Sequence, residues 1–137
     1  MRMRLLLLAA IVATPGVALA RDCTREEAMA AEAIAARLTD WKQVFGAFER
    51  FSHCDDGAIA EGFTDSVVRL LATQWPTLPQ VAALENQNPS FRAFVLRHID
   101  ASADSADLEK VAGLARSQCP SGHGALCSAI ARAASEE

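Results

Sequence analysis

The densest group of polar side chains begins with His53, Asp55 and Asp56 and continues with Glu61 and Asp65. Carboxylate oxygens and an imidazole nitrogen are ligands for divalent cations, although this spacing matches no EF-hand loop. Glu61 and Asp65 are four residues apart, so a helix would place these like charges on one face, which is unfavourable unless a positive group covers them. We therefore interpret Asp55, Asp56, Glu61 and Asp65 as a candidate partner-binding surface. The simpler alternative is a capped and solvated helix face.

A second pair of reactive residue types, Ser121 and His123, is separated by a single glycine. Side chains this close in a turn rarely reach the orientation that a serine nucleophile and its base require. The chain has no G-x-S-x-G, H-E-x-x-H or glycine-rich phosphate motif. We expect no catalytic residue, no metal site and no cofactor, and we interpret this segment as an exposed turn.

Other conspicuous side chains are expected to be structural. His98 lies near the apolar edge of a predicted helix, which favours a partly buried histidine bonded to a carbonyl over a ligand. Trp41 and Trp75 each begin or end an apolar stripe, so we expect both to pack in the core.

The four cysteines are Cys23, Cys54, Cys119 and Cys127. An even number of cysteines in a small exported domain predicts two disulfides. Metal binding is the alternative interpretation, but no two of these cysteines have the C-x2-C spacing typical of zinc sites.

The N-terminus has the pattern of a secretory signal peptide. Two arginines precede a short apolar run over residues 5–12, and the small residues Ala18 and Ala20 suit a signal peptidase. This run is shorter than the roughly 20 residues that a membrane-spanning helix needs. We predict that residues 1–20 are a signal peptide cleaved after Ala20, and that the mature protein is periplasmic.

Length and charge limit the class of partner. Residues 21–137 are enough for a single domain and contain 11 basic and 17 acidic residues, a net charge of −6. Because no basic stripe is present, nucleic acid and membrane surfaces are poor partners. A basic protein would be attracted instead.

Helical patterns follow one another along residues 21–137, and alternating strand patterns are nearly absent. We predict an all-α fold, a single small bundle of six or seven short helices stapled by two disulfides. The expected helices cover about residues 24–38, 40–51, 55–75, 77–85, 89–99, 105–118 and 125–134.

Local signals set the ends and faces of the first helices. Thr24 to Glu27 forms a capping box, after which Met29, Ile34 and Leu38 are expected to face inward. Thr39 or Asp40 is expected to cap the second helix. Its apolar stripe contains Trp41, Val44, Phe45, Phe48 and Phe51.

The third helix is expected to be capped by Asp55 and Asp56 and to end before Pro76. Its apolar residues keep helical phase across Gly62, which favours one continuous helix over two pieces. Asn88 and Pro89 predict the start of a later helix, which turns its phenylalanines inward.

The helices also predict the disulfide pairing. If the first two helices pack antiparallel, the start of the first, at Cys23, lies beside the end of the second, at Cys54. Cys119 and Cys127 flank a short turn that contains two glycines and a proline, so they are expected to pair locally.

Two stretches, CDDGAIAEGFTDSV (54–67) and FVLRHID (94–100), resemble a group of small exported Gram-negative proteins without an assigned activity. This resemblance covers about residues 41–127 and implies a shared helical fold with paired cysteines and no catalytic residue. The overall plan is also similar to that of periplasmic immunity proteins, which neutralise cell-wall-degrading toxins from rival cells.

These features predict a periplasmic binding protein of immunity or inhibitor type, which neutralises a partner enzyme by protein–protein contact through the acidic residues. The alternative function is a periplasmic sensor or carrier for a small ligand or metal, with His53 and the same carboxylates as ligands. An envelope hydrolase that uses His123 or Glu61 is the third and least favoured interpretation.

Overall fold

The computed structural model describes residues 20–136 of the chain, and in this part it is all-helical. The predicted signal peptide therefore lies, apart from Ala20, outside the described residues. The α-helices are α1 (Arg25–Ala35), α2 (Trp41–Phe51), α3 (Gly57–Thr73), α4 (Pro79–Glu85), α5 (Ser90–Arg97), α6 (Ser105–Ser117) and α7 (Gly124–Ala133). Two 3-10 turns, η1 (Ser52–Cys54) and η2 (Trp75–Thr77), flank α3. The prediction of a small all-α bundle is confirmed.

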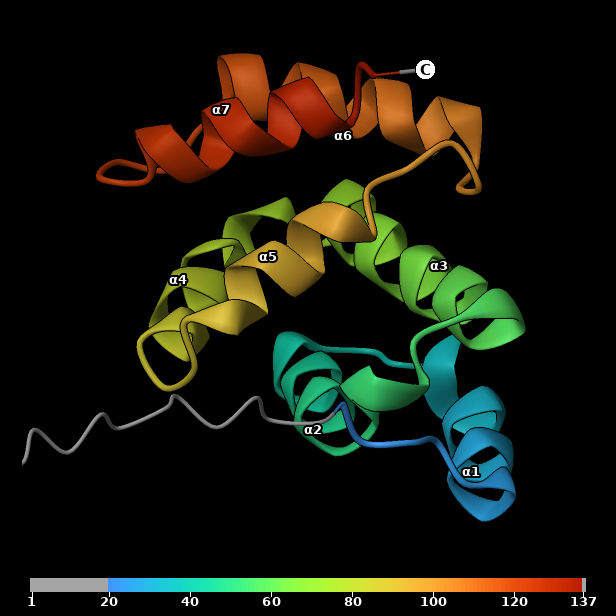
Figure 1. The fold of residues 1–137 in the computed structure, drawn as a ribbon. Helices are drawn as coiled ribbons and strands as arrows, with labels where there is room; N and C mark the ends of the chain where they lie inside the picture. The colour runs from blue at the N-terminus through green and yellow to red at the C-terminus, as the bar shows by residue number, and fades with distance from the viewer. Residues whose placement is uncertain (1–19, 137) are drawn as a thin grey trace, which may run out of the picture.

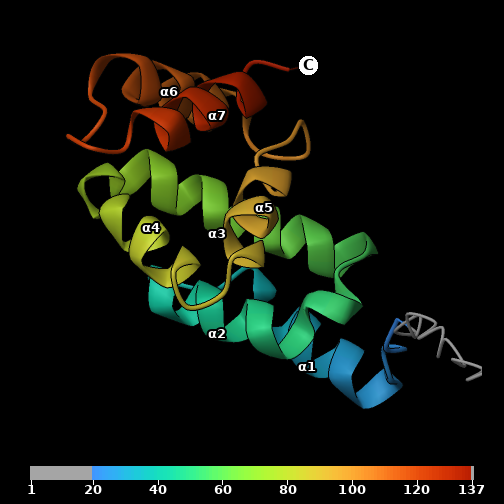
Figure 2. The same cartoon turned by 60° about the vertical axis from the view of Figure 1, so that its left-hand side comes forward.

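Helix α3 is the central element (Figure 1). Helices α1 and α2 lie at one end of the molecule, and α6 packs on α7 at the opposite end (Figures 1 and 2). Helix α3 contacts α1 on one side and α6 on the other, while α4 and α5 pack on each other beside it. The core therefore forms along α3, which explains why its apolar stripe is almost completely buried.

The predicted helix starts are confirmed for the first three helices. Thr24 and Glu27 form a reciprocal capping box at α1, and the Asp40 carboxylate accepts a hydrogen bond from the Gln43 N–H at α2. At α3 only Asp56 acts as the cap, through its bond from the Gly57 N–H. The helix is continuous through Gly62, as expected from the phase of its apolar residues.

The predicted inward face of α1 is wrong for two of its three residues. Met29 is 62% exposed and Ile34 is 37% exposed, whereas Leu38 is buried. The face that meets the core consists instead of Ala31 and Ala35. Small side chains suffice there because α1 and α3 approach each other closely.

Gly62 sets this close approach. A Cβ atom at Gly62 would lie 2.8 Å from the Cβ of Ala35 and 3.0 Å from the backbone nitrogen of Ala36. Any side chain at Gly62 would therefore separate the two helices. The buried Ser66 hydroxyl completes the contact, because it donates to the Ala35 carbonyl and accepts from the Leu38 N–H.

Both predicted disulfides are present. Cys23–Cys54 joins the residue preceding the α1 cap to the last residue of η1, and Cys119–Cys127 closes the turn between α6 and α7. Disulfides of this kind fit a protein that is exported to an oxidising compartment.

Candidate functional site

The structure buries one of the four predicted surface carboxylates. The Asp55 side chain is only 4% exposed, and its Oδ2 atom accepts hydrogen bonds from Arg97 and from His98 Nε2, which lies 3.0 Å away. Asp55 is thus neither a helix cap nor part of a contact surface. It anchors the segment before α3 to the end of α5.

His98 extends this contact into a buried network. Its Nδ1 atom lies 3.1 Å from the Thr64 hydroxyl, which in turn donates to Asp100 Oδ2 at 3.1 Å. His98 is more deeply buried than the sequence suggested, and its partners are a hydroxyl and a carboxylate instead of a carbonyl. The network joins α3 to the end of α5 through side chains that are more than 30 residues apart in sequence.

The number of protons available for the hydrogen bonds of this network predicts the charge of the His98 ring. The Thr64 hydroxyl has one proton, and it is used in the bond to Asp100. His98 Nδ1 must therefore donate to Thr64, and Nε2 must donate to the Asp55 carboxylate, which only accepts. This arrangement predicts an imidazolium at His98, whose charge together with that of Arg97 would balance the charges of Asp55 and Asp100.

The carboxyl pKa values agree with this arrangement. Burial by itself would raise the pKa of Asp55, but the hydrogen bonds from His98 and Arg97 outweigh it and lower the pKa below its usual value. The pKa of Asp100 is also lowered, because bonds from Ser102 and Thr64 and the charge of His98 outweigh its burial.

A hydroxyl, an imidazole and a carboxylate joined one to the next by hydrogen bonds are the components of a nucleophilic triad. Here, however, Thr64 is only 1% exposed and its proton points to Asp100, not to His98. A substrate cannot reach this hydroxyl without opening the core. The network is therefore structural.

The three remaining predicted carboxylates are exposed, but they do not form one cluster. Asp56 is the N-cap of α3, whereas Asp65 lies more than two helical turns further along that helix. Glu61 and Asp65 do lie on the same side of α3, and the positive group that covers Asp65 is Arg69, at 2.6 Å. Arg69 also donates to the carbonyls of Ala36 and Leu38 and so holds the C-terminal end of α1.

Ile34 on α1 marks an exposed apolar surface that the sequence did not predict. Ile34 lines a groove of about 420 Å³ where α1 meets α2. The other lining residues are Ala33, Arg37, Leu38 and Gln43. We call this set the α1 groove surface; Met29, five residues before Ile34 and so about 140° around the helix, does not belong to it. Asp65 borders it, because Arg69 links the Asp65 carboxylate to the backbone of Leu38.

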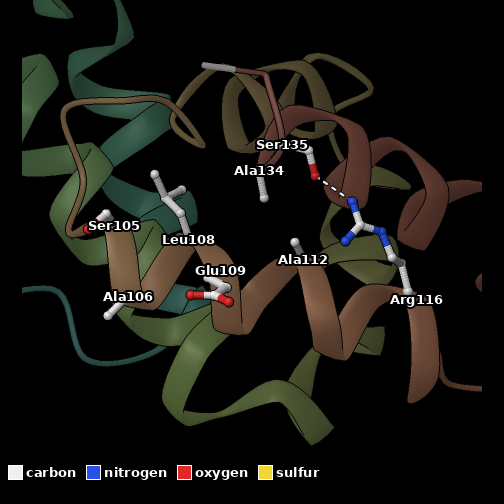
Figure 3. Close-up of a pocket in the computed structure, with 8 residues that line it drawn as sticks. All are labelled: Ser105, Ala106, Leu108, Glu109, Ala112, Arg116, Ala134 and Ser135. Carbon is white, nitrogen blue, oxygen red and sulfur yellow. Dashed lines mark hydrogen bonds between the residues drawn. The ribbon is translucent and has the colours of Figure 1, made fainter.

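A second hollow of about 400 Å³ lies between α6 and the end of α7 (Figure 3). Leu108, Ala112 and Ala134 line its apolar part, while Glu109 and Arg116 are its charged residues. The Arg116 guanidinium already has a hydrogen-bond partner, because it donates to the Ser135 hydroxyl at 2.6 Å. This hollow contains no pair of groups suited to acid–base or nucleophilic chemistry.

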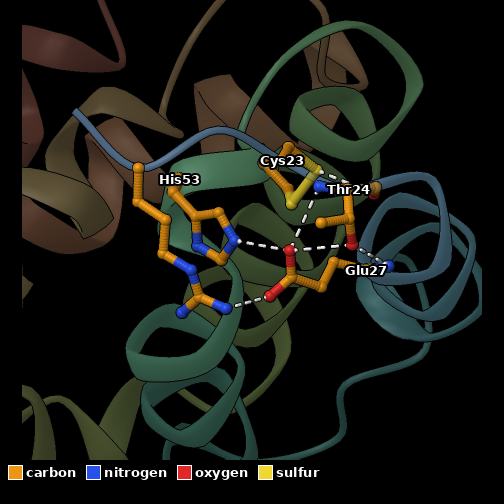
Figure 4. The surroundings of a disulfide bond; sticks show 6 residues. Cys23, Thr24, Glu27 and His53 are labelled. Atoms are coloured by element: carbon orange, nitrogen blue, oxygen red, sulfur yellow. Dashed lines mark hydrogen bonds and ion pairs between the residues drawn. A yellow bond between two sulfur atoms is a disulfide. The ribbon is translucent and has the colours of Figure 1, made fainter.

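A third polar cluster surrounds the Cys23–Cys54 disulfide (Figure 4). Glu27 accepts bonds from the Thr24 N–H and hydroxyl, forms an ion pair with Arg21, and has Oε2 at 3.3 Å from His53 Nε2. The Thr24 backbone N–H, followed by His53, lowers the pKa of Glu27 to about 2. His53 is thus turned toward Glu27, a residue that the sequence did not connect with it.

The remaining candidates occupy structural positions. His123 precedes α7 at its N-cap position, and no hydrogen bond joins it to Ser121 in the described part of the chain. Both tryptophans are buried, as predicted. Trp41 donates to the Thr77 hydroxyl and Trp75 donates to the Gln118 carbonyl.

Comparison with known protein families, with characterised proteins and with solved structures finds no match to this chain. Among the described residues, no helix is long and apolar enough to cross a membrane.

Proposed function

We propose that the protein is a periplasmic binding protein of immunity or inhibitor type, which neutralises a basic partner enzyme through the α1 groove surface. The observation that carries this proposal is the exposure of Ile34, a large apolar side chain, at the groove between α1 and α2. Among the large hydrophobic side chains of residues 20–136, only Met29 and Ile34 are exposed.

An apolar groove with a charged border is the usual anatomy of a protein-binding surface. The groove accepts one apolar side chain of the partner against Ile34 and Leu38. Asp65, which is linked to Leu38 through Arg69, and Glu61, one turn earlier on α3, favour a partner with basic residues around that anchor. The excess of acidic residues in the mature chain acts in the same direction over a longer range.

Capture experiments with matched variants test this proposal. The mature, oxidised protein is used to capture partners from periplasmic extracts and from secretions of competing bacteria. We expect one basic enzyme in a stoichiometric complex with the wild type. Ile34→Asp should weaken binding by about 30-fold or more, the effect of losing a central contact.

Two charge reversals on exposed helical glutamates provide the comparison. Glu61→Lys, one helical turn before Asp65 on α3, should slow association and change its salt dependence. Glu109→Lys on α6, at the opposite end of the molecule, should leave binding unchanged. Capture that is indifferent to Ile34→Asp, or a partner with an acidic surface, would contradict the proposal.

A further inference from the structure

The Cys23–Cys54 disulfide lies within a set of metal-ligating side chains. The ligand atoms of Glu27, His53 and Cys54 all lie within 4.8 Å of one another, and Cys23 is bonded to Cys54. They come from the start of α1 and from η1, which the disulfide holds together (Figure 4). Two thiolates, an imidazole and a carboxylate are a donor set that suits a tetrahedral zinc ion.

The distance between the two non-sulfur donors fits such an ion. In a tetrahedral site with zinc–nitrogen and zinc–oxygen bonds of about 2.1 Å, the two donor atoms are about 3.4 Å apart. His53 Nε2 and Glu27 Oε2 are separated by 3.3 Å. The His53 Nε2 atom is buried, meets no partner within hydrogen-bond geometry and lies beside a Glu27 carboxylate oxygen. A shared cation would satisfy both atoms.

The surroundings of Glu27 also suit a ligand. Thr24 fixes the orientation of the carboxylate through its N–H and hydroxyl, as residues around metal ligands commonly do. Arg21, the remaining partner, is exposed and is free to leave.

We infer that the Cys23–Cys54 pair is a redox-gated zinc site, closed as a disulfide and open to one Zn²⁺ ion when reduced. A dithiol reductant supplies two electrons and two protons, the sulfur–sulfur bond breaks, and the reductant becomes a disulfide. Zn²⁺ then binds both sulfur atoms as thiolates and releases their two protons. The metal ion replaces the covalent link between α1 and η1. These two elements are therefore joined both in the disulfide form and in the reduced, zinc-bound form.

The exposure of the two cysteines indicates from which side a thiol reductant approaches the disulfide. Cys23 is an exposed residue whereas Cys54 is buried, so an external thiolate approaches the disulfide from the Cys23 side. The second disulfide, Cys119–Cys127, has no comparable set of carboxylate and imidazole donors among the described residues. This inference does not depend on the proposed binding partner.

Cobalt binding tests the inference, because Co²⁺ occupies zinc sites and its absorption reports thiolate ligands and tetrahedral geometry. The experiment uses the mature Cys119→Ser/Cys127→Ser variant, which retains only the disulfide in question, and compares its oxidised and reduced forms. We expect the reduced form to bind one Co²⁺ with thiolate charge-transfer and tetrahedral bands. The oxidised form should show neither band, and Zn²⁺ should displace the cobalt.

Two ligand variants separate this site from a simple dithiol. Glu27→Gln retains a residue that completes the capping box but removes the anionic ligand, and His53→Gln removes the imidazole. Each should weaken metal binding at least tenfold, while the helical circular dichroism of the oxidised forms stays unchanged. A reduced protein without thiolate bands, or with affinity that neither variant changes, would overturn the inference.

Discussion

His98 Nε2 lies 3.0 Å from Asp55 Oδ2, in the interior of the molecule, across 43 residues of sequence. The pair fastens the end of α5 to the turn before α3, and Arg97 adds a second bond to the same oxygen. Because both side chains are almost completely buried, removing Asp55 would leave His98 Nε2 without a hydrogen-bond partner.

Asp55→Ala should therefore destabilise the protein by about 3 kcal/mol, the usual cost of breaking a buried charge pair. The neighbouring Asp56→Ala removes only a helix cap and should cost about 1 kcal/mol. Urea unfolding monitored by circular dichroism measures both. Equal effects of the two substitutions would show that Asp55 is not held as described.

The imidazolium form of His98 is a separate prediction. Nitrogen-detected NMR at about neutral pH should show a proton on both ring nitrogens of His98. In Thr64→Val, which removes the hydroxyl that Nδ1 donates to, the bond at that nitrogen should be lost. A single bare ring nitrogen in the wild-type spectrum would contradict the proton count.

Gly62 and Gly113 provide matched tests of the contact between α1 and α3. Gly62→Ala places a Cβ against Ala35 and the backbone of Ala36, and should cost about 1–3 kcal/mol as an overpacked site. Gly113→Ala on α6 meets no atom within 4 Å and should stabilise the protein by about 0.5–1 kcal/mol. Thermal unfolding of the two variants should move in opposite directions, and a neutral Gly62→Ala would refute the close approach.

Glu27 predicts a specific acid sensitivity. Its pKa falls from 4.5 to about 2 on folding, so the carboxylate form stabilises the native state. This contribution is complete above pH 4.5 and is lost as the pH falls towards about 2. In Glu27→Gln this part of the acid dependence should disappear, which unfolding measurements between about pH 5 and pH 2 would detect. An unchanged pH profile would contradict the contacts assigned to Glu27.

The elements with strong local signals could be predicted from the sequence. The Thr24 capping box, the Asp40 cap and the stripe from Trp41 to Phe51 each depend on neighbours within a turn or two. The pairing of Cys23 with Cys54 followed from the lengths of two adjacent helices.

The wrong predictions have one physical origin. The sequence of a single helix does not specify which other helix will pack against it. The large apolar residues of α1 predict one buried face. The structure buries the face with the small residues Ala31 and Ala35 instead, because Gly62 on α3 allows the two helices to approach closely. A glycine within an otherwise helical pattern was the available signal for this close packing.

Asp55 was placed on the surface for a similar reason. Its partners, Arg97 and His98, belong to α5, and no local pattern connects them with residue 55. Glu27 and His53 are likewise 26 residues apart and become neighbours only when α1 and η1 pack together.

The most direct test of the proposed function is a titration of the captured enzyme's activity with the mature protein. Our account predicts complete inhibition at a one-to-one ratio by the wild type and by Glu109→Lys. Under the same conditions Ile34→Asp should require about 30-fold more protein for the same inhibition. Full activity of the enzyme at saturating wild-type protein, or equal inhibition by Ile34→Asp, would contradict the role of the α1 groove surface.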